Sequence, residues 1–165
     1  MENETNNNLK SIFDKYDKKQ SKAREEHAKE KSEKELFLDN FAKKVQDVIQ
    51  PAFDELAESI KSRGHDCKIT IEQESHDTEG HTQSAQIRMS IYPNGQRPQS
   101  HRLHECPSIS FIAGSEAKKV FTHVSTMMLS AGGTSGTHNE YSLENITKEI
   151  VEKEVIYLLS ECFGK

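Results

Sequence analysis

The chain has 165 residues, of which 33% are hydrophobic and 30% charged, and its formal net charge is −5. Residues 1–35 contain nine basic and nine acidic side chains, so the acidic excess belongs to residues 36–165. Non-specific binding to nucleic acid needs basic side chains that neutralise phosphates, and an anionic membrane also attracts basic surfaces. The charge balance therefore argues against both classes of partner. The length of 165 residues suits a single domain with an appendage.

The chain carries no signal for a membrane or for export. No apolar run approaches the roughly 20 residues of a transmembrane helix, and the N-terminus lacks the basic and apolar regions of a signal peptide. Three cysteines, Cys67, Cys106 and Cys162, are widely spaced and odd in number. Free thiols in a reducing compartment explain this pattern.

We expect a cytoplasmic protein with no membrane contact and no cofactor.

Residues 1–34 are predicted to form a charged arm, either helical or disordered. The arm is rich in Lys, Glu, Ala and Gln, which favour helix. Residues 17–35 contain no large apolar side chain, so a coiled-coil seam is missing. The large apolar side chains of the arm lie nearer the N-terminus: Leu9, Ile12, Phe13 and Tyr16.

Residues 35–165 are predicted to form a single domain that starts with a helix over 35–63. Apolar residues recur at helical spacing from Phe37 to Ile60. Pro51 interrupts this pattern, and either a kinked helix or two abutting helices would fit. Gly64 is expected to end the helix in a left-handed conformation.

Four strands are predicted next, over residues 67–74, 85–92, 108–113 and 119–129. The first three show the alternation of a sheet with one buried face. The fourth is apolar on both faces, which indicates that the arm, a second protomer or a partner covers its outer side. Short connections between the strands favour an antiparallel meander.

The end of the chain is predicted to contain a glycine-rich loop over 131–141 and a helix that ends near Cys162. The expected fold is therefore α+β, with a long N-terminal helix, a four-stranded antiparallel β-meander and a C-terminal helix. Both helices would pack on one face of the sheet, because this arrangement buries all three apolar surfaces.

Histidines and a cysteine suggest a metal site only weakly. His101, His104 and Cys106 are close in sequence. A strand would place 104 and 106 on one face and 101 on the other, whereas a helix would pair only 101 with 104. Zinc sites show tightly paired ligands, and no fourth ligand is evident. We expect no metal here and interpret the segment as a polar loop.

Two tripeptides, His76-Asp-Thr78 and His123-Val-Ser125, resemble the signature of the two-histidine phosphoesterases. The resemblance implies that each histidine and its neighbouring hydroxyl share a strand face and flank a phosphate. His123 and Ser125 do share a face of a predicted strand, but His76 lies in a turn-rich stretch. The repeated halves of that family are missing. The alternative is that His123 is a partly buried strand residue with a satisfied hydrogen bond.

Candidate binding residues lie in the glycine-rich loop and on the outer face of the sheet. Glycines supply flexibility, so a lid or partner-binding loop is one interpretation of the loop, and a mobile linker is the other. Basic side chains on the outer face could form a local patch. The candidate binding residues are Gly132, Gly133, Gly136, His138, Arg88 and Lys118.

The expected function is binding without catalysis, by an accessory subunit, inhibitor or adaptor of bacterial or mobile-element origin. Its partner would be another protein or a second copy of the chain, as in a homodimer. One alternative is a small phosphoesterase or nucleotide-binding enzyme that uses His123, a second histidine and the Gly132–Gly136 loop. Another is a nucleic-acid-binding accessory protein, which requires a continuous basic stripe.

Overall fold

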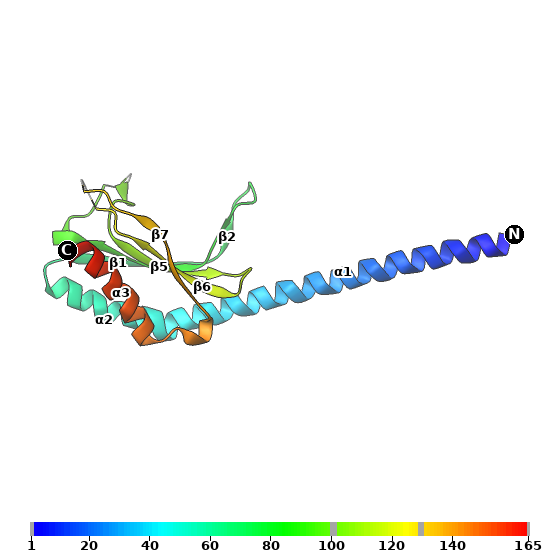
Figure 1. Ribbon diagram of the computed structural model, residues 1–165, viewed down its shortest axis with the longest axis horizontal. Helices are drawn as coiled ribbons and strands as arrows, with labels where there is room; N and C mark the ends of the chain where they lie inside the picture. Colours follow the sequence, from blue (N-terminus) through cyan, green and yellow to red (C-terminus); the bar gives the residue numbers. More distant parts are fainter. Residues whose placement is uncertain (1, 100–101, 129–130, 165) are drawn as a thin grey trace. The chain divides into compact units, whose positions relative to one another are not determined.

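The computed structural model describes residues 2–99, 102–128 and 131–164 and shows an α+β fold (Figure 1). By its internal contacts the chain divides into two compact units, Met1–Leu36 and Phe37–Lys165. The N-terminal unit is helical, and every side chain over residues 3–32 is exposed. It therefore has no core of its own.

The helices at the start of the chain follow one another without a break. α1 (Glu2–Lys44) passes through the π-helical turn η1 (Val45–Ile49) into α2 (Gln50–Ser62), and the residues at both junctions keep right-handed helical dihedrals. Pro51 near the start of α2 cannot donate a backbone hydrogen bond to the preceding turn. The wider π-helical turn accommodates this loss. The backbone is thus one continuous helix and not two abutting helices.

The antiparallel sheet of the second unit has five strands in the order β1-β4-β5-β6-β7. Their bounds are β1 (Asp66–Glu72), β4 (Gln86–Tyr92), β5 (Ser108–Gly114), β6 (Lys119–Ser125) and β7 (Ser135–Tyr141). A short hairpin of β2 (Ser75–His76) and β3 (Thr82–Gln83) forms a separate sheet. Gly64 ends α2 with a φ of 88°, as predicted, and leads into β1.

The prediction of four strands is wrong in number, because β7 occupies most of the predicted glycine-rich loop. Its sequence, Ser-Gly-Thr-His-Asn-Glu-Tyr, is almost entirely polar and exposed. A strand at the edge of a sheet buries little surface, so it need not alternate. The prediction that the strand 119–129 is apolar on both faces is also wrong. β6 ends at Ser125, and its outer face includes His123.

Helices cover one face of the sheet. α2 and α3 (Lys148–Phe163) pack against each other and against the sheet, while the β2–β3 hairpin rises on the opposite side (Figure 1). This confirms the predicted C-terminal helix and its place on the sheet. None of the described helices is long and apolar enough to cross a membrane.

The core lies between the helices and the inner face of the sheet. Phe53 of α2 stands edge-on to Phe111 of β5, with ring centroids 5.9 Å apart, and both rings are fully buried. The inner-face residues of β4 and β5 surround this pair with branched and sulfur-containing side chains: Ile87, Met89, Ile91 and Ile109. Phe111 belongs to the alternating pattern of β5 and Phe53 to the helical pattern of α2, so the contact joins the two patterns of buried residues.

We predict that Phe53→Ala lowers the free energy of unfolding by about 3–5 kcal/mol, because the cavity it leaves opens against Phe111. Urea denaturation measures this change. Leu36→Ala is the control, since that side chain is 60% exposed; it should change stability by less than about 0.5 kcal/mol. Equal losses in the two variants would contradict the placement of the core.

Candidate functional site

The face of the sheet that points away from the helices carries two rows of polar side chains. Residues that are directly paired across strands project to the same side. The first row contains Thr70, Arg88, Ser110, His123 and Thr137. The second row contains Lys68, Ser90, Ser108, Ser125 and Ser135. We call these two rows the outer-face rows.

Hydrogen bonds link side chains across the outer-face rows. Arg88 Nε donates to Ser110 Oγ at 3.0 Å, and Ser135 Oγ lies 3.2 Å from His123 Nε2. Ser110 is only 1% exposed, whereas Arg88 is exposed. The bond to Ser110 draws the guanidinium of Arg88 over β5, toward His123 on β6. Three predicted site residues, Arg88, His123 and Ser125, therefore share one face.

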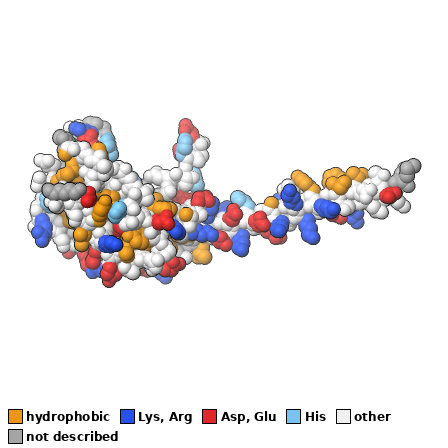
Figure 2. Space-filling view, viewed as in Figure 1, with side chains coloured by type: hydrophobic (Ala, Val, Ile, Leu, Met, Phe, Trp, Pro, Cys, Tyr) orange, Lys and Arg blue, Asp and Glu red, His pale blue; other side chains and the backbone are white. Residues whose placement is uncertain are grey.

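Loops and a hairpin border this face at its two ends. The β2–β3 hairpin follows β1, and the loops after β4 and β6 lie at the opposite end (Figure 1). The outline of the second unit dips beside the β2–β3 hairpin (Figure 2). At the loop end, Cys106 is 4% exposed, and burial raises the pKa of its thiol against the opposing effects of Ser90 and Arg88. Cys106 therefore lies beside the outer-face rows as a neutral thiol.

The two histidine motifs lie in different sheets. His76 belongs to the β2–β3 hairpin, where its Nδ1 lies 2.9 Å from Thr82 Oγ1. Thr78 lies exposed at the tip of this hairpin. His123 and Ser125 belong to β6. No described hydrogen bond or ion pair joins the hairpin residues to those of β6.

The predicted glycine-rich loop is a hairpin connection that continues into a strand. Thr126 N donates to Thr134 O at 2.8 Å, and Gly133 adopts a φ of 152°. A Cβ at Gly133 would lie 2.5 Å from the carbonyl oxygen of Thr126, so this position requires glycine. Gly136 lies within β7 and has open space around it. A binding role for these glycines stays a prediction.

The two other predicted binding residues, Lys118 and His138, lie in different elements. Lys118 lies in the turn between β5 and β6 with a φ of 53°, away from the middle of the strand that holds Arg88. His138 lies in β7, where its ring stacks on Tyr157 of α3 with centroids 3.9 Å apart. Lys118 therefore lies in a turn outside the sheet, whereas Arg88 lies within β4.

Sequence reasoning missed a buried carboxylate that joins β7 to α3. Glu154 has no exposed surface. It accepts hydrogen bonds from Asn139 Nδ2 at 2.7 Å and from Tyr141 Oη, and its Oε2 lies 2.8 Å from His138 Nδ1. Three side chains of β7 thus meet at one carboxyl group of α3. The signal was available, because position 154 lies on the same helical face as Val151 and Leu158.

The hydrogen bonds keep Glu154 ionised. Burial by itself would raise the pKa of the carboxyl group, but the bonds from Tyr141, His138 and Asn139 outweigh it and hold this pKa below its ordinary value. Burial and the bond to Glu154 raise the pKa of Tyr141. The carboxylate therefore fixes an edge strand that buries few apolar side chains of its own.

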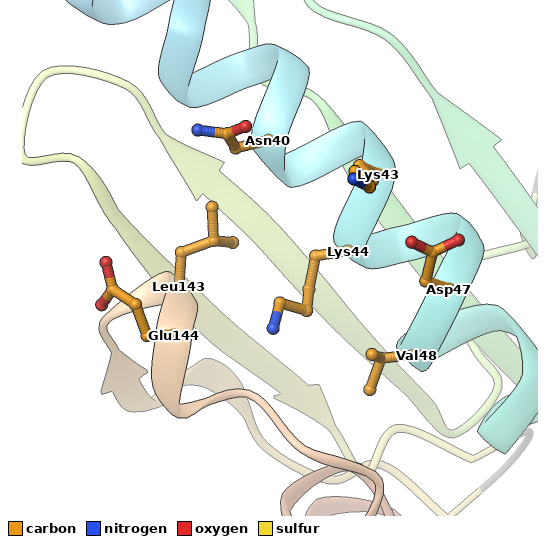
Figure 3. Close-up of a pocket in the computed structure, with 7 residues that line it drawn as sticks. All are labelled: Asn40, Lys43, Lys44, Asp47, Val48, Leu143 and Glu144. Atoms are coloured by element: carbon orange, nitrogen blue, oxygen red, sulfur yellow. The ribbon is translucent and has the colours of Figure 1, made fainter.

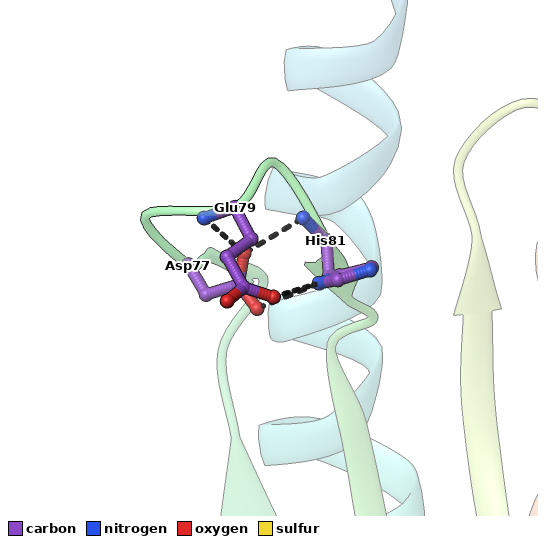
Figure 4. Close-up of side chains that lie close together, drawn as sticks. All are labelled: Asp77, Glu79 and His81. Atoms are coloured by element: carbon purple, nitrogen blue, oxygen red, sulfur yellow. Dashed lines mark hydrogen bonds and ion pairs between the residues drawn. The ribbon is translucent and has the colours of Figure 1, made fainter.

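One group of side chains in the described part of the chain is close enough to hold an ion. The ligand atoms of Asp77, Glu79 and His81 lie within 4.8 Å of one another (Figure 4). Asp77 Oδ1 accepts from the backbone N–H groups of Glu79 and His81 at 2.9 and 2.8 Å. These bonds stabilise the turn of the β2–β3 hairpin and lower the pKa of Asp77. All three side chains are exposed. The hydrogen bonds of Asp77 within the turn explain why these three side chains lie close together.

The metal site considered from the sequence, His101, His104 and Cys106, is not among the groups of described side chains that lie close enough to hold an ion. His101 lies outside the described residues. His104 is exposed, and its Nε2 lies 3.9 Å from Glu105 Oε1. The thiol of Cys106 is buried and donates to the backbone oxygen of Leu103 at 3.2 Å. His104 and Cys106 thus have separate surroundings.

A shallow cavity of about 320 Å³ lies between the first helix and the segment before α3 (Figure 3). Its lining combines both charges with two apolar side chains: Asn40, Lys43, Lys44, Asp47, Val48, Leu143 and Glu144. Lys44 Nζ donates to the backbone oxygen of Ile146 at 3.3 Å and so ties the two walls together. Nothing in this lining forms a catalytic arrangement.

The arm carries an apolar stripe that sequence reasoning recorded only as separate residues. The stripe residues are Leu9, Ile12, Phe13 and Tyr16, and their exposed fractions are 47%, 61%, 60% and 58%. Spacings of three and four residues place them on one side of α1. We call them the arm stripe. A monomeric helix gains nothing from four large exposed apolar side chains in a row, so the stripe suggests a surface for contact.

Comparison of the chain with protein-family models, with curated proteins and with solved structures gave no match.

We predict that Glu154→Gln lowers the free energy of unfolding by about 3 kcal/mol at pH 7, because three donors lose a charged acceptor. The lowered native pKa gives stability that is fully present above the ordinary value of 4.5 and disappears as the pH falls through the native pKa. The difference in free energy of unfolding between the wild type and the Glu154→Gln variant should therefore decrease below pH 4.5. Urea denaturation at several pH values measures it. Glu58→Gln, an exposed change on α2, is the control, and a gap independent of pH would contradict this account.

We also predict opposite effects for two glycines of the same segment. Gly133→Ala should lower stability by about 1–3 kcal/mol, since its φ and its contact with Thr126 exclude a side chain. Gly136→Ala should raise stability by about 0.5 kcal/mol, because alanine loses less entropy in a strand. Thermal unfolding of both variants compares them, and equal effects would show that the hairpin is not fixed at Gly133.

Proposed function

We propose that the protein works by binding another protein non-covalently, as an accessory subunit, inhibitor or adaptor. The arm stripe carries this proposal. Recognition of a helix in a groove uses apolar anchors at positions i, i+3, i+4 and i+7, and Leu9, Ile12, Phe13 and Tyr16 have this spacing. Full burial of one such side chain contributes about 1.5–3 kcal/mol. The stripe therefore offers enough apolar surface for a specific contact.

The charges beside the arm stripe favour a particular kind of groove. Residues 8–19 contain four lysines and two aspartates. An apolar groove with an acidic rim would complement this segment, and charge of opposite sign speeds association. The charged remainder of the arm, 17–35, has no large apolar residue and would serve as a solvated spacer.

Two further observations support parts of this proposal. Cys67, Cys106 and Cys162 are all free thiols, as expected in the cytoplasm, where we place the protein. Self-association is the second form of the proposal. β7 lies at the edge of the sheet and pairs with β6 alone, so its other edge could add a strand from a second copy.

We predict that Ile12→Asp combined with Phe13→Asp weakens binding of the partner. Full-length wild-type protein on a column would capture the partner from a lysate of the native host, and mass spectrometry would identify it. Affinity is then measured by calorimetry with the purified partner. The double variant should bind at least about tenfold more weakly, because two apolar anchors become charged.

A matched control separates loss of the anchors from loss of charge balance. Ala23→Asp combined with Ala28→Asp makes the same change of charge on exposed positions of the same helix. Circular dichroism would compare the helix content of both variants. The control should retain wild-type affinity. Retention of affinity by the Ile12 and Phe13 variant would overturn the role of the arm stripe.

A further inference from the structure

Arg88 lies on β4 in the first outer-face row, and it has no acidic partner among the described residues. Its one described hydrogen bond runs from Nε to Ser110, and no carboxylate of the described residues forms an ion pair with it. The two terminal amino groups of the guanidinium thus remain available. A guanidinium whose Nε is fixed presents these groups in a planar fork that matches two oxygens of one anion.

The other charges on this face are placed so that they leave the surroundings of Arg88 positive. Lys68 lies in the next row, diagonally across from Arg88, and is exposed. Glu72 also lies diagonally across, on the other side, but its carboxylate accepts bonds from the side-chain amides of Gln83 and Gln86 at 2.7 and 2.8 Å. Asp66, near the loop end of the face, is paired with Arg97 at 2.6 Å.

Imidazole and hydroxyl groups lie beyond β5, on the other side from Arg88. His123 and Ser135 form a hydrogen-bonded pair on β6 and β7, and Ser125 lies in the row next to His123. An imidazole and hydroxyl groups bind the oxygens of an anion at fixed angles. An anion held by the fork of Arg88 above Ser110 would lie between that fork and this pair, since β5 separates β4 from β6 by only two strand spacings.

We propose that the outer-face rows bind a small molecule through its phosphate group, with Arg88 as the principal ligand and His123 and Ser135 as further donors. Lys68 supplies a second positive charge, which favours a dianion over a carboxylate. The β2–β3 hairpin borders one end of this face, and the loops after β4 and β6 border the other end (Figure 1). This site is independent of the arm stripe and of the binding function proposed for it.

The test is a titration of full-length protein with inorganic phosphate, followed by NMR signals of the Arg88 side-chain Nε–H and of the His123 ring. We expect saturable shifts at both groups. Arg88→Gln keeps a donor for Ser110 and should weaken phosphate binding by about tenfold. Acetate, a monoanion, should bind more weakly than phosphate, and phenyl phosphate should bind at least as well.

Arg63→Gln is the matched control. Arg63 is the exposed residue that follows α2 as its C-cap, so this variant loses the same charge outside the outer-face rows and should bind phosphate like the wild type. Equal weakening in both variants would show a general charge effect and overturn the site. Absence of saturable shifts, or equal binding of acetate and phosphate, would overturn it as well. The Ile12 and Phe13 variant should bind phosphate normally, which separates this proposal from the function of the arm.

Discussion

The alternation of side chains across the sheet is the constraint on which the rest of the structure depends. One side of β1, β4, β5 and β6 presents apolar residues, which must be covered, and α2 and α3 cover them. The fixed period of two then leaves Arg88, Ser110 and His123 together on the other side. The core and the proposed phosphate site thus lie on opposite faces of one sheet, and the same alternation of side chains gives rise to both.

β7 extends this sheet by a different means. It contains almost no apolar side chain, and a buried carboxylate, Glu154, gathers donors from its residues. A buried charge is expensive to desolvate, so it contributes to the fold only when its hydrogen bonds are complete. This arrangement ties β7 to α3 and holds Ser135 beside His123. The position of β7 at the edge of the sheet therefore depends on its hydrogen bonds to Glu154 of α3.

Sequence reasoning found the elements whose burial leaves a periodic pattern. Phe53, Ile87 and Phe111 lie in periodic patterns of buried residues, so the helices and the strands β1, β4, β5 and β6 were predictable. β7 was not, because its side chains are exposed at an edge and their polar composition is also typical of a loop. For the outer-face rows, His123 and Arg88 were candidates, but only the strand register shows that they share a row with Ser110.

The arm stripe is the surface most directly connected with the proposed function, and hydrogen exchange of the full-length protein tests it best. Exchange would be followed by mass spectrometry, first on the free protein and then on its complex with the captured partner. We predict that protection on binding centres on residues 8–19, with little change in the five-stranded sheet. Protection confined to the sheet or the β2–β3 hairpin, with unchanged exchange in the arm, would contradict the account.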